Sequence, residues 1–307
     1  MTPLASWFRA CAGSFDGALR AFPDGCQVPL KEWTNHGLKF LVRNYGNVFE
    51  VVSDQMLFVL RRVETSLLAL PWWLVILIIC AVAWHASRNR WLVVGLAASL
   101  LFIGTLGLWD DTMRTLAIML IATTLTVLVG IPIGILMATN KVIRAVMNPI
   151  LDGMQTMPSF VYLIPVVFFF GLGNVAAIFA IFIYAVPPVI RLTNLGIRLV
   201  DGEIVEAADA FGATARQVLW GVRVPLAMPT IMAGVNQAIM MALAMAVIAS
   251  MIGARGLGAQ VLRGLNNGNV GLGLQAGLAI VVLAVILDRI TAAYGKRLDP
   301  TQPAGAR

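Results

Sequence analysis

The sequence is poor in charged residues, and this shortage excludes a soluble globular domain. Charged side chains make up 12% of the 307 residues and the mean hydropathy is +0.86, whereas soluble domains carry about 25% charged residues. Histidine and cysteine are also scarce, with 2 and 3 residues. His36 and His85 lie far apart in the sequence and predict no metal site. No Ser-His-Asp or Cys-His arrangement predicts a catalytic centre.

The chain also lacks a Gly-x-x-x-x-Gly-Lys-Ser/Thr sequence, the loop that binds nucleotide phosphates. We therefore expect that the chain does not bind ATP, is not itself an enzyme and needs no cofactor. We predict no catalytic residues. If ATP drives this protein, a separate partner has to hydrolyse it.

Ionisable residues are rare inside the apolar segments, which disfavours an ion-coupled secondary transporter. Such carriers usually place acidic or histidine residues within the hydrocarbon core. Asp110 and Asp111 lie at the end of one predicted span. Asp288 and Arg289 lie at the end of another, and only Arg191 approaches membrane depth. Nothing resembles a selectivity filter, so a passive channel is disfavoured too.

Long apolar runs dominate the sequence instead. Several reach the roughly 20 residues that a helix needs to cross about 30 Å of hydrocarbon, and no alternating strand pattern competes with them. We predict an all-α, polytopic membrane protein with about seven transmembrane helices. They lie near Leu67–Ala86, Trp91–Trp109, Thr115–Thr139, Pro158–Leu172, Val175–Leu192, Leu226–Ile252 and Gly271–Asp288.

Glycine and proline mark irregularities between and within these segments. The run Gly171–Asn174 is expected to form a tight break, so that the fourth and fifth segments make a hairpin. Pro187 and Pro188 are expected to kink the fifth segment.

The first 66 residues carry no apolar run of the signal-peptide kind. Residues 48–63 have apolar side chains at helical spacing, which fits either an interfacial helix or a helix packed on the first span. Cys11 and Cys26 either pair, if this tail meets an oxidising periplasm, or stay free. Cys80 lies within a span and is expected to behave as a small apolar residue.

A polar insert of about two dozen residues, near 198–225, separates the fifth and sixth segments. Asp201 is suited to cap a short helix that places Ile204, Ala208 and Phe211 on one apolar face. Gly212 is suited to end that helix in the left-handed conformation.

A second short helix is expected to follow in the same insert. Thr214 and Gln217 have the spacing of a capping box, and Pro225 marks the entry to the next span. These signals favour either a compact knob that docks a soluble partner or an ordinary amphipathic loop.

Basic residues predict which side of the membrane the insert occupies. The segments on its side carry twelve of them, against three on the opposite side when the amino-terminal tail is excluded. The positive-inside rule therefore places the insert in the cytoplasm. With an odd number of spans, the amino terminus lies outside and the carboxy terminus inside. The net charge of +7 follows from this topology and does not indicate nucleic-acid binding. The twelve are Arg88, Arg90, Lys141, Arg144, Arg191, Arg198, Arg216, Arg223, Arg289, Lys296, Arg297 and Arg307, and the three are Arg114, Arg255 and Arg263.

The insert also carries a sequence signature. Glu206-Ala207-Ala208, three residues, Gly212, nine residues and then Val222-Arg223-Val224-Pro225 resembles the cytoplasmic signature of binding-protein-dependent ABC importer permeases. Val222 and Val224 stand where that family usually has isoleucine and leucine. The resemblance implies that a cytoplasmic ABC ATPase contacts the insert. The residues implied in this coupling are Glu206, Ala207, Ala208, Gly212 and Pro225.

From about Trp109 to Thr291 the chain resembles the permease of the glycine betaine/proline osmoprotectant importers. This resemblance implies a permease homodimer in the bacterial inner membrane, with a pair of ATPases inside and a periplasmic substrate-binding protein outside. It favours glycine betaine, proline betaine or proline as solute, with choline or carnitine as alternatives. The runs that carry it are Leu151–Pro158, Val161–Pro165, Leu192–Arg198 and Ile252–Gly258.

The resemblance divides the chain into four parts. A tail (1–66) and two peripheral transmembrane helices (67–109) precede a permease core of five helices (110–292), which includes the insert (198–225). Residues 293–307 form a cytoplasmic tail.

Aromatic, amide and methionine side chains are candidates for the translocation path, because aromatic faces attract quaternary ammonium groups. Helix packing is the alternative for each of them, and the two adjacent amides are also suited to bridge helices. The candidates are Phe160, Tyr162, Tyr184, Asn236, Gln237, Met240, Met241 and Met245.

Small residues at helical spacing predict close helix contacts. Gly130 and Gly134 form one such pair, and Ala238–Ala249 contains a stripe of alanines. Either the core of the bundle or a dimer seam fits them. The segment Gly256–Gly273 is expected to be a periplasmic loop or short re-entrant helix that either meets a binding protein or is a plain surface loop.

Overall fold

The computed structural model describes residues 30–298, in which every regular element is a helix. The chain divides into two compact units, residues 1–51 and 52–307. The first contributes the beginning of α2 (Leu30–Ala69), and the second contains the rest of that helix and all the others. Cys11, Cys26 and the tail beyond residue 298 lie outside the described residues.

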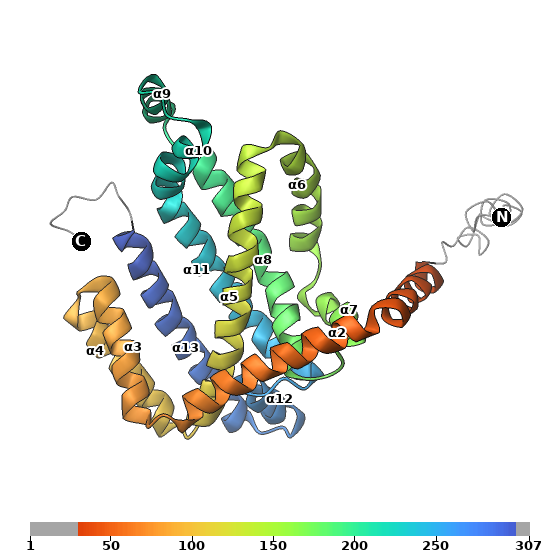
Figure 1. Ribbon diagram of the computed structural model, residues 1–307. Coiled ribbons are helices and arrows are strands. Elements are labelled where there is room, and N and C mark those ends of the chain that lie inside the picture. The colour runs from red at the N-terminus through yellow and green to blue at the C-terminus, as the bar shows by residue number, and fades with distance from the viewer. Residues whose placement is uncertain (1–29, 299–307) are drawn as a thin grey trace, which may run out of the picture. The chain divides into compact units, whose positions relative to one another are not determined.

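The helices of the second unit follow one another with short connections (Figure 1). They are α3 (Trp72–Ser87), α4 (Arg90–Thr105), α5 (Trp109–Thr139), α6 (Lys141–Thr156), the 3-10 turn η2 (Ser159–Tyr162), α7 (Leu163–Phe170), α8 (Asn174–Arg198), α9 (Gly202–Ala210), α10 (Ala215–Val218), the π turn η3 (Leu219–Arg223), α11 (Val224–Ala249), the 3-10 turn η4 (Ser250–Ile252), α12 (Leu257–Asn266) and α13 (Val270–Arg297).

Four helices in the described part of the chain are long and apolar enough to cross a membrane, which confirms the all-α polytopic fold. The number rises to six if each of two bent helix pairs counts as one span, and α4 is a shorter apolar helix. The four match the third, fifth, sixth and seventh predicted segments. They are Trp109–Thr139, Asn174–Arg198, Ala215–Ile252 and Val270–Arg297.

A proline interrupts the first predicted segment, and another marks the start of the fourth. α2 ends at Ala69 and α3 begins at Trp72, with Pro71 as its N-cap. The fourth segment is only the second half of a broken pair, α6 and η2–α7, bent by 111°. Pro158 causes this break, because proline has no amide hydrogen and holds the preceding residue, Met157, extended.

The centre of the second unit is α8, which packs against both α5 and α11. In Figure 1, α5 crosses in front of these two helices. A Cβ at Gly130 would lie 2.8 Å from Val189 Cγ1, and one at Gly134 would lie 2.5 Å from Thr193 Cβ. The predicted glycine pair therefore brings α5 onto α8 within one chain.

The alanine stripe of α11 also belongs to the bundle. Ala238, Ala242 and Ala249 are buried, and Gly234 on the same face approaches the Pro188 carbonyl of α8. These small residues serve the core of the bundle in the single chain.

α8 continues as one helix through Pro187 and Pro188.

The predicted helix over residues 48–63 is confirmed as part of α2. Leu60 is buried in the main hydrophobic core of the second unit, and Met56 and Val63 pack against that core. Packing therefore accounts for these three side chains, whereas Val52 and Val59 are exposed, as the interfacial alternative expects.

The bundle has two ends, which we call the insert end and the α12 end (Figure 1). The insert end contains α9, α10 and the last turns of α5, α8 and α13. The α12 end contains α12, the first turns of α5, α8 and α13, and the Gly171–Asn174 break, where Gly171 and Gly173 have φ of +72° and +121°.

Candidate functional site

The first helix of the insert, α9, begins as the sequence predicts. The Asp201 carboxylate accepts a hydrogen bond from the Glu203 amide over 3.0 Å. Asp201 therefore satisfies an amide that the first turn leaves free and places negative charge at the positive end of the helix. This cap marks the start of α9 as a helix separate from α8, which ends at Arg198.

The turn after α9 is also as predicted. Gly212 has φ of +81°, and the Ala213 amide donates to the Ala208 carbonyl over 3.1 Å. Gln217 and Thr214 form a reciprocal capping box, with the Thr214 amide 2.8 Å from Gln217 Oε1. The two helices are thus joined by a tight, hydrogen-bonded corner.

None of the nine residues of α9 is buried in the described chain. Phe211, which follows it, is 94% exposed, and Ile204 is 45% exposed. Figure 1 shows α9 projecting beyond the ends of the long helices. A large aromatic ring left in water on a projecting helix is typical of a binding surface. Glu206 and Ala207 are exposed on the same helix, and Ala208 is half-buried.

The insert continues without a break into the sixth predicted segment. α10, the π turn and α11 form part of one helical run, Ala215–Ile252, of 38 residues. Pro225 is the second residue of α11, at the entry to the span as the sequence predicts, and Val224 separates it from the π turn. The Val224 amide bonds to the Leu219 carbonyl, five residues back. The wider turn carries the helix into a proline that has no amide hydrogen to donate.

The path candidates do not form one group. Tyr162 and Tyr184 meet edge to face with ring centroids 5.9 Å apart, and the Tyr162 hydroxyl donates to the Met154 carbonyl. Tyr162 is 5% exposed, so this pair packs the contact between η2 and α8. Phe160 is exposed.

On α11 the two adjacent amides point to different surroundings. Asn236 Nδ2 donates to Asp288 Oδ1 over 2.8 Å, and the Thr291 hydroxyl donates to Asn236 Oδ1. Gln237 and Met240 are exposed on another face. Met241 is half-buried and Met245 is buried. Asn236 therefore bridges α11 and α13, whereas Gln237 and Met240 stay open to a solute or to a partner.

Sequence reasoning missed the partner of Asn236. It placed Asp288 at a span end, but α13 continues to Arg297, so Asp288 lies about 13 Å from the end of its helix at 1.5 Å per residue. The amide of Asn236 was the signal that could have predicted this contact. An amide within an apolar helix requires a hydrogen-bond partner, and so does a carboxylate in apolar surroundings.

Asn236→Leu is expected to destabilise the purified chain by about 1 kcal/mol, because it leaves the Asp288 carboxylate without its amide donor. Thermal unfolding in detergent measures this. The double variant Asn236→Leu/Asp288→Leu should recover most of the loss. If both variants keep full stability but lose transport, Asn236 lines the path instead of bridging helices.

Within residues 30–298 no three His, Cys, Asp or Glu side chains come together as metal ligands.

Residues 130–300 match the family described as "Binding-protein-dependent transport system inner membrane component". The glycine betaine/proline betaine transport system permease protein ProW of Escherichia coli is 44% identical over 88% of this chain and 76% of its own length. The glycine betaine/carnitine transport permease protein GbuB of Listeria monocytogenes is 42% identical over 88% of this chain and 96% of its own.

Among solved structures, a chain of the inward-facing MetNI methionine ABC transporter aligns with a TM-score of 0.57 at 20% identity. It covers 62% of this chain and 95% of that chain. This likeness shows the fold.

Proposed function

The chain belongs to the family of binding-protein-dependent transport system inner membrane components, and we propose that it forms the membrane path for glycine betaine and related quaternary amines. It is a permease component of an ABC importer in the inner membrane. The 44% identity to the glycine betaine/proline betaine permease over 88% of the chain carries the choice of solute. Proline, choline and carnitine are the alternatives.

We assign ATPase coupling to Glu206, Ala207, Ala208, Gly212 and Pro225. This assignment is supported by the exposure and projection of α9. The apolar face at Ile204 and Phe211 is exposed and available to enter a groove on the ATPase. The capped corner at Gly212 fixes the angle between α9 and α10. Two copies of the chain, each held by one ATPase, complete the importer that we propose.

The insert end faces the cytoplasm in this proposal, and the α12 end faces the periplasm and the substrate-binding protein. The excess of basic residues at the insert end supports this orientation. In a Phe211→Cys variant, the new thiol should then not react with an impermeant reagent that is added outside sealed, right-side-out vesicles.

Uptake into the same vesicles tests the solute. The complete complex, with ATPase and binding protein, is expected to accumulate labelled glycine betaine and proline betaine when ATP is enclosed. Carnitine, choline and proline complete the panel. Accumulation of an unrelated amino acid, with none of the quaternary amines taken up, would refute the proposed solute class.

A further inference from the structure

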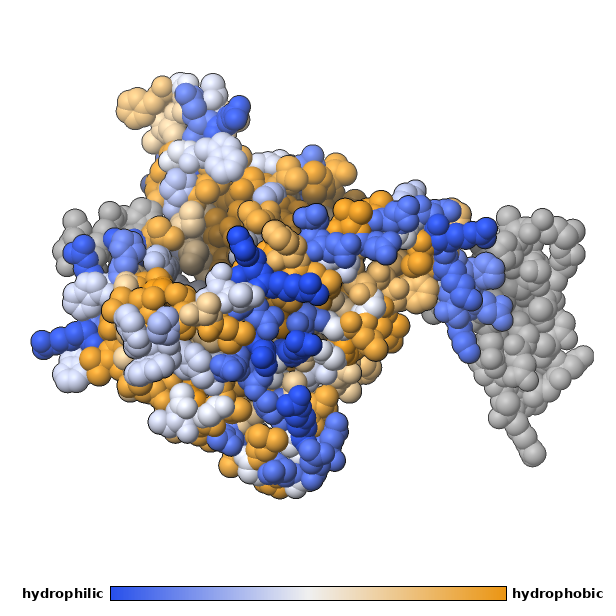
Figure 2. Space-filling model, turned by 60° about the horizontal axis from the view of Figure 1, so that its bottom comes forward, coloured by the Kyte–Doolittle hydropathy of each residue, from blue (hydrophilic) through white to orange (hydrophobic). Residues whose placement is uncertain are grey.

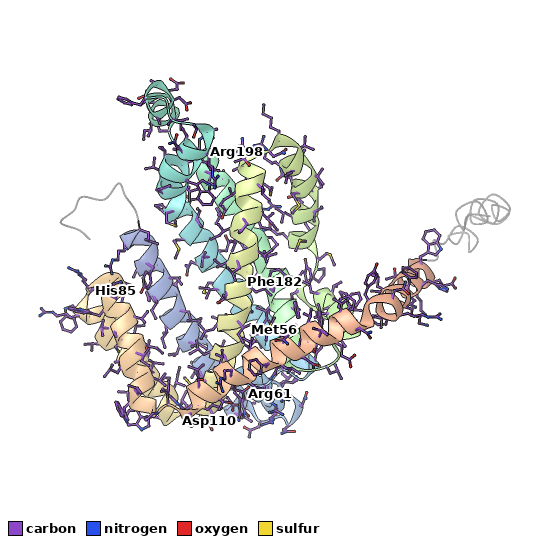
Figure 3. The ribbon with its side chains drawn as sticks, viewed as in Figure 1. Met56, Arg61, His85, Asp110, Phe182 and Arg198 are labelled. Carbon is purple, nitrogen blue, oxygen red and sulfur yellow. The ribbon has the colours of Figure 1, made fainter. Side chains whose placement is uncertain are left out.

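The α12 end contains a polar cavity of about 630 Å³ between the first turns of α5 and the segment that leads into α12. Figure 2, which brings this end forward, shows hydrophilic atoms gathered on it. Figure 3 places Asp110 at the lower end of α5. Neither the coupling insert nor the path candidates account for this cavity.

One wall of the cavity is fixed by hydrogen bonds between distant segments. The Leu257 amide donates to Thr115 Oγ1 over 2.9 Å, and the Arg255 amide donates to Asn174 Oδ1 over 2.9 Å. Gly256 between them has φ of +115°, and a Cβ there would lie 2.4 Å from Thr115 Oγ1. The backbone at Arg255 is therefore held against both α5 and α8, and only glycine fits beside it.

Two of the charges in the cavity wall are already engaged. Arg114 Nε lies 3.2 Å from a carboxylate oxygen of Glu64, and Arg114 also approaches Asp111 over 3.4 Å. Gln260 donates to the other oxygen of Asp111. These groups hold the start of α5 to α2 and α12.

Three other charges in the wall are left over. Asp110, Arg255 and Arg263 are exposed, and none has an ion-pair partner among residues 30–298. The half-buried Trp109 lines the same cavity. The cavity thus offers two guanidinium groups, one carboxylate and an indole ring to whatever enters it.

We infer that this cavity is an entry site for a small zwitterion that carries a carboxylate and a quaternary ammonium group. Arg255 and Arg263 would take the carboxylate, because guanidinium groups pair with it through charge-assisted hydrogen bonds. Asp110 and the ring of Trp109 would take the ammonium group. The inference rests on the proposed function, since it requires that the α12 end receives the solute.

The mixture of charges favours a zwitterion over an anion. A phosphate group or other anion would meet the like charge of Asp110, and a simple cation would meet two arginines. Solvent screens the exposed groups, so each contact is weak. Weak binding suits an entrance, because a transport pathway has to release what it binds.

Solute binding to the permease–ATPase complex, without the binding protein, tests this site. Saturation-transfer NMR would compare glycine betaine with choline, which lacks the carboxylate, and with 3,3-dimethylbutyrate, which lacks the positive charge. Arg255→Gln/Arg263→Gln is expected to weaken glycine betaine binding about fivefold and to strengthen choline binding, because the two like charges that oppose a cation are removed. Asp110→Asn should weaken glycine betaine and spare 3,3-dimethylbutyrate. Arg62→Gln, an exposed arginine outside the cavity, is the matched control.

The outcomes separate this inference from the proposed function. Equal glycine betaine binding in all variants, or no binding by a complex that still accumulates glycine betaine, would overturn the entry site alone. Loss of binding-protein capture with unchanged solute binding would make the cavity a protein-docking surface and would also overturn it. Failure of the unmodified complex to accumulate any quaternary amine would remove the proposed function itself.

Discussion

Glu206→Lys and Gly212→Asp are each expected to abolish co-purification of the chain with its ATPase and to abolish ATP-driven uptake. Glu206 is exposed on the projecting helix, so lysine reverses a charge on the docking surface without disturbing the core. Gly212 has φ of +81°, which a residue with a Cβ adopts at a cost of roughly 1–2 kcal/mol. The corner between α9 and α10 should therefore change its angle.

Gly202→Asp is the matched control for the glycine variant. Gly202 is the first residue of α9, and a Cβ there would meet no atom within 4 Å. An aspartate in the first helical turn is favourable, so ATPase association should be kept. Glu206→Lys and Gly202→Asp should unfold at the same temperature as the parent chain, and Gly212→Asp only a few degrees lower, at about 2–4 °C per kcal/mol. Full association and uptake in Glu206→Lys and Gly212→Asp would refute the docking assignment.

Gly134→Ala is expected to lower the unfolding temperature in detergent by about 5 °C or more, and with it the yield of folded protein. A Cβ at Gly134 would lie 2.5 Å from Thr193 Cβ and 2.8 Å from the Ile190 carbonyl oxygen. The second contact is with backbone, so no side-chain rotation relieves it. α5 and α8 have to move apart at the centre of the bundle.

Gly277→Ala in α13 provides the comparison, because a Cβ at Gly277 would meet no atom within 4 Å. Alanine is a better helix former than glycine by about 1 kcal/mol, so this variant should be as stable as the parent chain or more so. If Gly134→Ala and Gly277→Ala unfold at the same temperature, the close α5–α8 approach does not contribute to stability.

Local signals were enough to predict the insert. Asp201, Gly212 and the Thr214–Gln217 pair act within a few residues of themselves, so their caps and turn follow from sequence spacing alone. The long apolar runs likewise predicted the four spanning helices.

Contacts between distant segments were beyond the same reasoning. α6 was missed because its sequence is polar along one side, and the ion pair of Asp152 with Arg191 on α8 joins residues far apart in the chain. Asn236 and Asp288, which form a hydrogen bond, are 52 residues apart. Sequence spacing therefore could not decide whether Asn236 packs helices together or lines the translocation path. The cavity at the α12 end depends on Thr115 and Leu257, which are 142 residues apart.

The continuous helical run from Ala215 to Ile252 connects the insert to the α12 end of the bundle. At 1.5 Å per residue its 38 residues extend about 57 Å, longer than the hydrocarbon is thick. Gly234, near its midpoint, lies close to α8: a Cβ there would lie 3.0 Å from Leu192 Cβ and 3.2 Å from the Pro188 carbonyl oxygen. Because α11 packs along α8, a push on the insert by the ATPase that we propose would be transmitted through this run to its other end. The other end is Ile252, whose carbonyl accepts from the Gly173 amide over 2.9 Å at the α12 end.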